Sequence, residues 1–301
     1  MTGAAGFLGT EVVRVLRSQG HEVFGLTRSI EGAERVRLAG AVPVIGDLFV
    51  AGQWQDEAAA DWVFHIAPRS ERGVRLTRRR GKSDAHVLTD ANLLDTVATG
   101  NTQRVVYVAD ACYYGTTGVN AITEEHTPRP LPRGTLLTPA LNRLDGYVVT
   151  GLPIVSVFPG VVYGYGSWFQ KRVADPLMTG RRVLRLGSAA AWVSPVHVHD
   201  CARALVHLAE HGESGGRYFV VNTEPTRMRN FAGGFAERIE RPLRFYPLPP
   251  RVTKLLVEPA LADYLRGNAL FSNIRLRATG FRFAYPTVDD GMRQIVGALH
   301  E

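Results

Sequence analysis

The stretch Thr2-Gly3-Ala4-Ala5-Gly6-Phe7-Leu8-Gly9 opens the chain and places three regularly spaced glycines directly before an amphipathic helical pattern. Glycine permits a tight turn and a close approach of the backbone to a ligand. The N-terminus of the helix that follows offers N–H donors and the positive end of the helix dipole. The stretch therefore predicts a phosphate-binding turn of the kind that holds a dinucleotide.

Short β-rich apolar runs alternate with helical patterns through the first half of the chain, which is typical of a parallel sheet with crossover helices. The predicted strands are Glu22–Thr27, Val42–Ile45, Asp61–Ile66, Arg104–Ala109 and Pro153–Phe158. The predicted helices are Glu11–Ser18, Glu31–Leu38, His86–Ala98, Leu136–Val149 and Asp200–Glu210. We therefore expect an α/β fold with a Rossmann-like, doubly wound parallel sheet.

The glycine turn begins at Thr2, so almost no residues of the given sequence remain to form the central strand of this sheet. A Rossmann unit needs a strand before that turn to carry it to the carboxyl edge of the sheet. The first strand is thus expected to be absent or truncated, and a start codon further upstream explains this better than a sheet without its middle strand. Adding a strand before Met1 should improve folding and cofactor affinity.

Domain boundaries are expected where the alternation loosens after Gly164. Residues 1–164 and 193–212 are predicted to form the nucleotide-binding domain. Residues 165–192 and 213–301, with short elements and a proline cluster at 247–250, are predicted to form a smaller C-terminal substrate-binding domain.

The residues after the second strand indicate which dinucleotide is bound. An enzyme that prefers NAD usually has an acidic residue there, whereas this chain has Arg28 and Ser29, which suit the 2′-phosphate of NADP(H). Asp47 and Leu48 follow the third strand, where a carboxylate could meet the adenine. The fourth strand ends in Ile66-Ala67-Pro68, whose small residues would lie beside the cofactor.

Eight motifs together resemble the extended short-chain dehydrogenase/reductase family almost from end to end. They are TGAAGFLG at 2–9, GDL at 46–48, VFHIA at 63–67, NLLD at 92–95, VVYVADACYYG at 105–115, FPGVVYG at 158–164, VHVHDCARAL at 196–205 and TVDDGMRQIV at 287–296. The resemblance implies a cofactor site with Gly3, Gly6, Phe7, Leu8, Arg28, Ser29, Asp47, Leu48, Ile66, Ala67, Pro68 and Pro159.

The catalytic residues of that family are missing. The resemblance implies a tyrosine that protonates the carbonyl oxygen, a lysine four residues later and a serine or threonine, but the first two positions are Leu137 and Leu141 and the third is Asp110. None of the ten tyrosines has a lysine four residues on. Asp110 and Tyr113 are the candidate catalytic residues. A carboxylate would oppose an incipient alkoxide unless it were protonated or paired.

Two interpretations remain open for the site. In the first, the protein is an NADPH-dependent ketoreductase whose substrate supplies the proton, since the cofactor carries the hydride chemistry. In the second, it is a catalytically inactive NADP(H)-binding or regulatory protein, or a diverged sugar-nucleotide epimerase or dehydratase. A flat aromatic ligand is suggested by the substrate-binding candidates, which are Tyr113, Tyr163, Trp168, Phe169 and Trp192.

The arginine- and alanine-rich composition, the intact cofactor motifs and the absent triad resemble the angucyclinone ketoreductases of simocyclinone-type antibiotic biosynthesis. That resemblance implies reduction of a ring carbonyl of an aromatic polyketide to a secondary alcohol by NAD(P)H, without a Ser-Tyr-Lys triad and with substrate-assisted protonation.

The composition argues against several other classes of protein. The formal charge of +7 comes almost wholly from arginine, and the basic run from Arg69 to Lys82 has no interleaved aromatic residues, so nucleic acid is not an expected partner. Cys112 and Cys201 have no metal-site spacing, and both are expected to be reduced and structural. No apolar run of about 20 residues that could span a membrane and no targeting segment is evident, so a cytoplasmic protein is expected.

Overall fold

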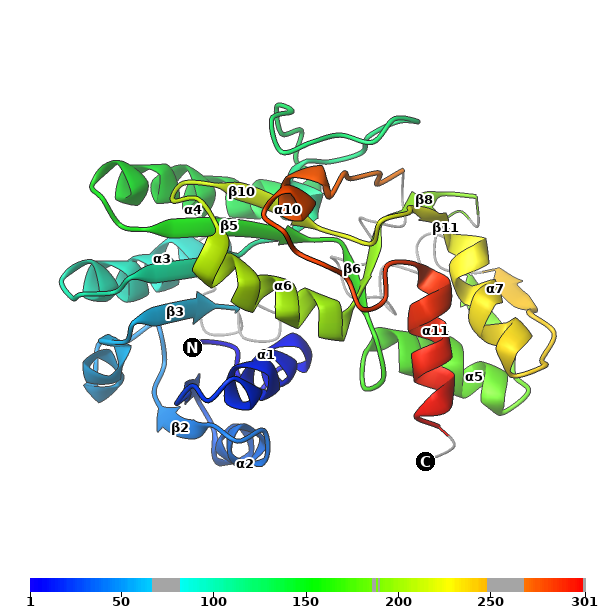
Figure 1. The fold of residues 1–301 in the computed structure, drawn as a ribbon, viewed down its shortest axis with the longest axis horizontal. Coiled ribbons are helices and arrows are strands. Elements are labelled where there is room, and N and C mark those ends of the chain that lie inside the picture. The colour runs from blue at the N-terminus through cyan, green and yellow to red at the C-terminus, as the bar shows by residue number, and fades with distance from the viewer. Residues whose placement is uncertain (67–81, 186–187, 189, 248–267, 300–301) are drawn as a thin grey trace. The chain divides into compact units, whose positions relative to one another are not determined.

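The computed structural model describes residues 1–66, 82–185, 188, 190–247 and 268–299 (Figure 1). The chain forms two compact units. Unit 1 consists of Met1–Asp110, Gly134–Phe158 and Ala202–Tyr218, and unit 2 of Ala111–Arg133, Pro159–Cys201 and Phe219–Glu301. These boundaries differ from the expected domains chiefly in placing Ala111–Arg133 and the segment from Pro159 in the second unit.

Unit 1 is built on parallel strands, as predicted. Its strands are β1 (Phe24–Thr27), β2 (Val42–Ile45), β3 (Trp62–His65), β4 (Arg104–Val108) and β5 (Ile154–Pro159). A further strand, β10 (Arg217–Val220), belongs to unit 1 as far as Tyr218. β1 pairs in parallel with β2, and β3 pairs with β4 and β4 with β5 in the same sense. All six residues of β5 are buried, which is expected of a parallel sheet covered on both faces.

Thr2 joins the two groups of strands. It forms parallel bridges to Leu26 of β1 and to His65 of β3, so it holds the place of the central strand. The strand order is therefore β2-β1-Thr2-β3-β4-β5-β10. The expectation that the first strand is absent or truncated is confirmed, because the central strand amounts to one bridging residue.

Helices connect the strands of unit 1 (Figure 1). They are α1 (Phe7–Ser18), α2 (Ile30–Leu38), α3 (Lys82–Ala98), α4 (Pro132–Val149) and α6 (Val198–His211), with a 3-10 turn η1 (Gln53–Ala58). On α1 the apolar positions Val12, Val13 and Leu16 are buried, and Gly20 follows its end with a φ of +87°. This left-handed backbone is the usual way for glycine to end a helix.

Unit 2 contains short strands and helices. They are η3 (Ala111–Tyr113), β6 (Val161–Tyr163), a π-helix η4 (Gln170–Ala174), α5 (Asp175–Met178), β7 (Val183–Arg185), β8 (Trp192–Val193), β9 (Pro195–His197), β11 (Thr226–Arg227), α7 (Met228–Arg238), β12 (Phe245–Pro247), α10 (Ile274–Ala278) and α11 (Val288–Gly297). The fully buried carboxylate of Asp200 accepts hydrogen bonds from the N–H groups of Ala284 and Tyr285 at 2.8 and 2.7 Å. These two bonds fix the loop that leads to α11.

Candidate active site

The glycine turn before α1 has a backbone that larger residues cannot adopt. Gly3 has a φ of +70°, in the left-handed region that favours glycine. The Gly6 N–H donates to the Gly3 carbonyl at 2.9 Å, which closes the turn. A Cβ on Gly9 would lie 2.0 Å from the Gly3 oxygen. Gly3 and Gly9 are thus required by the geometry of the turn.

The end of α1 at this turn is suited to an anion. Gly6 is the N-cap residue, and no side chain among the described residues caps the helix. The first N–H groups of any helix, here those of Phe7 and Leu8, lack acceptors within the helix. Together with the helix dipole they form a site for a phosphate group. The turn therefore fits the pyrophosphate of a dinucleotide.

The loop after β1 presents a cation beside this turn. Thr2 and β1 are parallel neighbours, so the residues that follow each of them lie at the same edge of the sheet. Arg28 is exposed there. Ser29 is the N-cap residue of α2, because its Oγ accepts the Gly32 N–H at 3.1 Å. Arg28 is therefore an exposed cation of this loop, and its contact with a 2′-phosphate stays a prediction.

The loop after β2 lies next to it, since the Gly46 N–H donates to the Thr27 carbonyl at 3.0 Å. Asp47 is half-buried, and one of its carboxylate oxygens accepts the Phe49 N–H at 3.0 Å. The carbonyl of Leu48 accepts the side-chain amide of Asn92 at 2.7 Å. These bonds hold the backbone of the loop in one conformation beside the glycine turn.

The remaining cofactor candidates do not all lie at this edge of the unit 1 sheet among the described residues. Ile66 is buried directly after β3, at the same edge as Thr2. Ala67, Pro68 and the basic run from Arg69 lie outside the described residues. Pro159 belongs to unit 2. The structure thus brings Gly3, Gly6, Phe7, Leu8, Arg28, Ser29, Asp47, Leu48 and Ile66 to one edge of the unit 1 sheet.

A buried polar network beneath this edge was not predicted from the sequence. Thr2 Oγ1 lies 2.8 Å from His65 Nδ1, and His65 Nε2 lies 3.1 Å from one carboxylate oxygen of Asp90. The Tyr107 hydroxyl donates to the other oxygen of Asp90 at 2.6 Å. Burial, and after it the Asp90 carboxylate, raise the pKa of Tyr107 well above its usual value. The network ties the turn to β3, β4 and α3.

The family's catalytic positions on α4 are apolar and buried. Leu137 and Leu141 are 5% and 2% exposed, and Leu144 continues the same buried stripe. Neither leucine can donate a proton or hold a ribose hydroxyl. Asp110 is half-buried two residues beyond the end of β4. Asp110 is ionisable, and it lies where the resemblance implies a serine or threonine.

The substrate-binding candidates lie in unit 2 and pack there. Tyr163 and Phe169 are completely buried in an aromatic cluster with Phe231, whose ring centroid lies 5.0 Å from that of Tyr163. Burial raises the pKa of the Tyr163 hydroxyl, which makes it a weaker acid. The indole N–H of Trp168 donates to the Val162 carbonyl at 3.0 Å. Packing accounts for these side chains, and their contact with a substrate stays a prediction.

Two further candidates have partners within unit 2. Tyr113 is 6% exposed, and its ring meets that of Tyr114 edge to face at 5.5 Å. Trp192 is half-buried, with the guanidinium carbon of Arg227 4.6 Å from its ring centroid. The cation over its face holds the Trp192 ring in place.

Metal sites with three or more protein ligands find no support among the described residues. Within the described ranges, no group of three or more His, Cys, Asp or Glu side chains is arranged to hold a metal ion. None of the described helices is long and apolar enough to cross a membrane. Both cysteines are fully buried.

Comparison with known family models gives a match over most of the chain. Residues 1–222 match the model of the NAD dependent epimerase/dehydratase family. The chain belongs to this family. Its membership accounts for the glycine turn and the parallel strands, and it makes the protein an oxidoreductase-like enzyme with a nicotinamide dinucleotide cofactor.

Curated relatives of the chain are named for different substrates. A 4-hydroxy-2-methyl-3-oxo-4-farnesyl-3,4-dihydroquinoline-1-oxide ketoreductase from Stigmatella aurantiaca is 27% identical over 77% of this chain and 70% of its own length. A dTDP-4-dehydro-6-deoxy-D-allose reductase from a Streptomyces species is 26% identical over 83% of this chain and 84% of its own length. Both relatives are reductases by name, but their substrates belong to different chemical classes.

Solved structures confirm the fold. The NAD complex of UDP-glucose 4-epimerase from Thermus thermophilus superposes with a TM-score of 0.78, covers 99% of this chain and 97% of its own, and is 22% identical. UDP-N-acetylglucosamine 4-epimerase from Methanobrevibacter ruminantium gives a TM-score of 0.80 at 17% identity, with coverage of 99% and 96%. The predicted Rossmann-like α/β fold is correct.

Proposed function

We propose that the protein is an NADPH-dependent ketoreductase that reduces a ring carbonyl of an aromatic polyketide, of the angucyclinone type, to a secondary alcohol. The observation that carries this proposal is the contrast within unit 1: the dinucleotide turn is complete, whereas Leu137 and Leu141 are buried apolar residues where the family would have its acid and its lysine.

The absence of a proton donor at these positions favours a particular kind of substrate. When bound, NADPH supplies the hydride that the carbonyl carbon accepts. The carbonyl oxygen then needs a proton, and a phenol beside it on the same ring system can give one through an existing hydrogen bond. Solvent reprotonates the phenolate, so the reaction consumes one NADPH and one proton and yields NADP⁺ and the alcohol.

The relatives support reduction of a ring ketone without deciding the substrate. The name of the Stigmatella relative places an oxo group on a dihydroquinoline, a fused ring system. The Streptomyces relative is named for a dehydro-sugar nucleotide. A fused-ring ketone agrees better with catalytic positions that carry leucines, because a saturated sugar has no phenol beside its carbonyl.

Turnover of a polycyclic aromatic ketone with an adjacent phenol tests the proposal. We expect the protein to consume NADPH and to form one alcohol stereoisomer, measured by absorbance at the nicotinamide band and by chiral chromatography. Substitutions Asp110→Asn and Tyr113→Phe should each lower kcat by less than about tenfold, well below the 10²- to 10⁴-fold contribution of a true general acid.

Different results would support the other functions. Loss of turnover in Asp110→Asn or Tyr113→Phe, with NADPH and ketone still bound, would make that residue the acid and contradict substrate-assisted protonation. Tight NADP(H) binding without turnover of any such ketone would identify an inactive binding protein. Turnover of a nucleoside-diphosphate sugar in its place would identify a diverged epimerase or dehydratase.

Cofactor choice can be tested at Arg28. We expect Arg28→Ala to weaken NADPH binding by about 10- to 100-fold, which corresponds to about 1.4 to 2.7 kcal/mol for a charge-assisted contact to phosphate, and to change NADH binding by less than about threefold. The matched control is Arg37→Ala, since Arg37 is an exposed residue of the nearby helix α2 that pairs with Glu34. Equal losses for the two cofactors would refute the 2′-phosphate assignment.

A further inference from the structure

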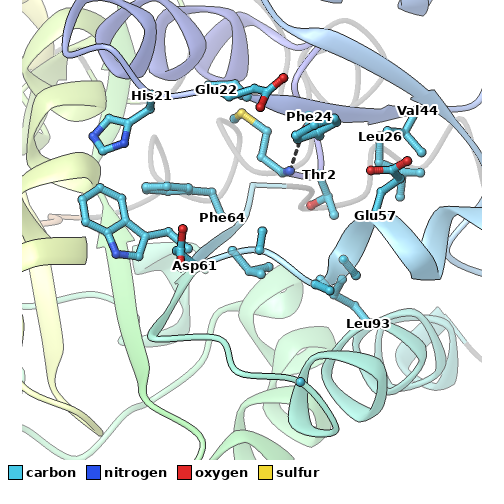
Figure 2. Close-up of a pocket in the computed structure, with 18 of the residues that line it drawn as sticks. Thr2, His21, Glu22, Phe24, Leu26, Val44, Glu57, Asp61, Phe64 and Leu93 are labelled. Carbon is cyan, nitrogen blue, oxygen red and sulfur yellow. Dashed lines mark hydrogen bonds between the residues drawn. The ribbon is translucent and has the colours of Figure 1, made fainter.

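Besides the dinucleotide edge, unit 1 has a cavity and a pair of neighbouring histidines. The cavity of about 790 Å³ lies between β1 and β3, and Figure 2 shows Phe24 and Phe64 facing it. Thr2, which holds the place of the central strand, also lines the cavity, so the cavity belongs to the sheet already described. The histidines are His207 and His211 of α6, and the proposed function makes no use of them.

The two histidines lie one turn apart near the end of α6, in the part of the helix that belongs to unit 1. Side chains four positions apart on a helix are neighbours on one face. The two rings are stacked, with their centroids 4.3 Å apart and their planes inclined by 13°. His207 is half-buried, and the side chain of His211 is 52% exposed. The pair thus presents two imidazoles together at the surface of unit 1.

Hydrogen bonding determines which nitrogen of His211 can bind a metal ion. His211 Nδ1 lies 3.1 Å from the His207 carbonyl oxygen and 3.6 Å from a carboxylate oxygen of Glu210. A carbonyl oxygen can only accept, so Nδ1 carries the proton of this bond, and the lone pair of the neutral ring is then on Nε2. Histidines that bind metals almost always donate their other ring N–H to a carbonyl or a carboxylate. His211 Nε2 is therefore prepared as a ligand atom.

The charges close to the pair indicate which class of ion it would select. Glu210 and Glu213 follow or flank His211 and are exposed. Arg203 lies one turn earlier on α6, and Arg104 donates to a carbonyl of the last turn at 3.0 Å. Two carboxylates and two guanidinium groups leave little net attraction for a cation. Ca²⁺ and Mg²⁺ depend on oxygen ligands, whereas Zn²⁺, Ni²⁺ and Cu²⁺ bind well to neutral imidazole. The pair therefore suits a transition metal.

We propose that His207 and His211 form a two-histidine binding site for a divalent transition-metal ion of the class of Zn²⁺, Ni²⁺ and Cu²⁺. Two histidines at this spacing on one helix face are an established way to hold zinc. Each imidazole supplies one nitrogen at about 2.0 to 2.1 Å, and water completes the coordination. The ion joins two successive turns of α6 and stabilises the end of the helix. This site is independent of the proposed function.

Titration of the 301-residue chain with ZnCl₂, followed by calorimetry, tests the proposal. We expect His207→Gln and His211→Gln each to weaken Zn²⁺ binding at least about tenfold, because a second ligand on the same helix typically strengthens binding by about 10²- to 10⁴-fold. The matched control is His126→Gln, which removes an exposed histidine of unit 2 whose Nδ1 accepts the Thr123 N–H at 3.2 Å. This control should change the affinity by less than about twofold.

Thermal unfolding gives a second readout, since an ion that binds only the folded chain stabilises it. Zn²⁺ should raise the midpoint of unfolding of the original chain and of His126→Gln, but not that of His211→Gln. His211 is the more exposed of the pair, so its replacement by glutamine should leave the fold intact.

Electron paramagnetic resonance with Cu²⁺ counts the ligand nitrogens directly. We expect splitting from two imidazole nitrogens in the original chain and from at most one in either glutamine variant of the pair. The proposal is overturned if the original chain and both variants bind Zn²⁺ equally well, or if the Cu²⁺ spectra of all three are the same.

Discussion

Two regions of unit 1 have diverged to different degrees from the family to which the chain belongs. At the edge formed by the glycine turn, Arg28 and Asp47, the Gly6 N–H closes the turn on the Gly3 carbonyl, and a Cβ on Gly9 would overlap the Gly3 oxygen. On α4, the positions for an acid and a lysine hold Leu137 and Leu141, which pack into the core.

Under the proposed function, binding of the dinucleotide and proton transfer are separable in this fold. The turn depends on backbone geometry, which a change on α4 does not alter. The acid depends on two side chains, and the proposal explains their replacement by leucine through a substrate that brings its own proton. The comparison predicts that changes on α4 alter stability and that changes at the turn alter cofactor binding.

The largest expected effect concerns the α4 leucines. We expect Leu141→Ala to lower the free energy of unfolding by about 2 to 5 kcal/mol, because a buried leucine is replaced by a cavity. The kcat per folded molecule should change by less than about twofold. Leu38→Ala is the control, since Leu38 is 78% exposed at the end of α2 and should cost less than about 0.5 kcal/mol. Urea unfolding and kcat measure the two quantities, and a large fall in kcat would give α4 a catalytic role.

The next effect concerns the turn. We expect Gly9→Ala to weaken NADPH binding by more than about tenfold and to lower the free energy of unfolding by about 1 to 3 kcal/mol, because the added methyl group would overlap the Gly3 oxygen. Gly146→Ala on α4 is the matched control, since its Cβ would meet nothing within 4 Å. This control should stabilise the helix slightly. Unchanged NADPH affinity in Gly9→Ala, measured by calorimetry, would refute the role of the turn.

The smallest effect concerns the strand position behind the turn. Burial lowers the pKa of the Met1 amino group from 8.0 to about 6, so between pH 6 and pH 8 the unfolded state binds more protons than the folded state. The 301-residue chain should therefore gain at most about 2 kcal/mol of stability as the pH rises through this window. Acetylation of the amino group should remove the gain. A slope that acetylation leaves unchanged would mean that another group causes it.

Much of the fold could be predicted from the sequence. The strand Val42–Ile45 was predicted with its observed bounds, and the strand predicted as Arg104–Ala109 ends one residue earlier, at Val108. Apolar runs bounded by turn residues determine such elements locally. The helix predicted from Glu11 begins at Phe7, because the glycine turn passes directly into it. The expected truncation of the central strand followed from the position of the turn.

The site could be predicted only where its geometry depends on the backbone. The Thr2–His65–Asp90–Tyr107 network was missed because its members lie up to 105 positions apart and no short motif connects them. The packing of Tyr163 and Phe169 was also not evident, because an aromatic residue looks the same in a sequence whether it faces a substrate or Phe231. Contacts between residues that lie far apart in the sequence leave no recognisable pattern in any short stretch of it.

The measurement that tests the central claim most directly compares two ketones that differ at one position. One has a phenol beside the carbonyl, and the other has a methoxy group there and so cannot give the proton. We predict that kcat with NADPH falls at least about 100-fold for the methoxy ketone, while its binding changes little, because general acid catalysis typically contributes 10²- to 10⁴-fold. Equal kcat values for the two ketones would contradict the account and would mean that the protein supplies the proton itself.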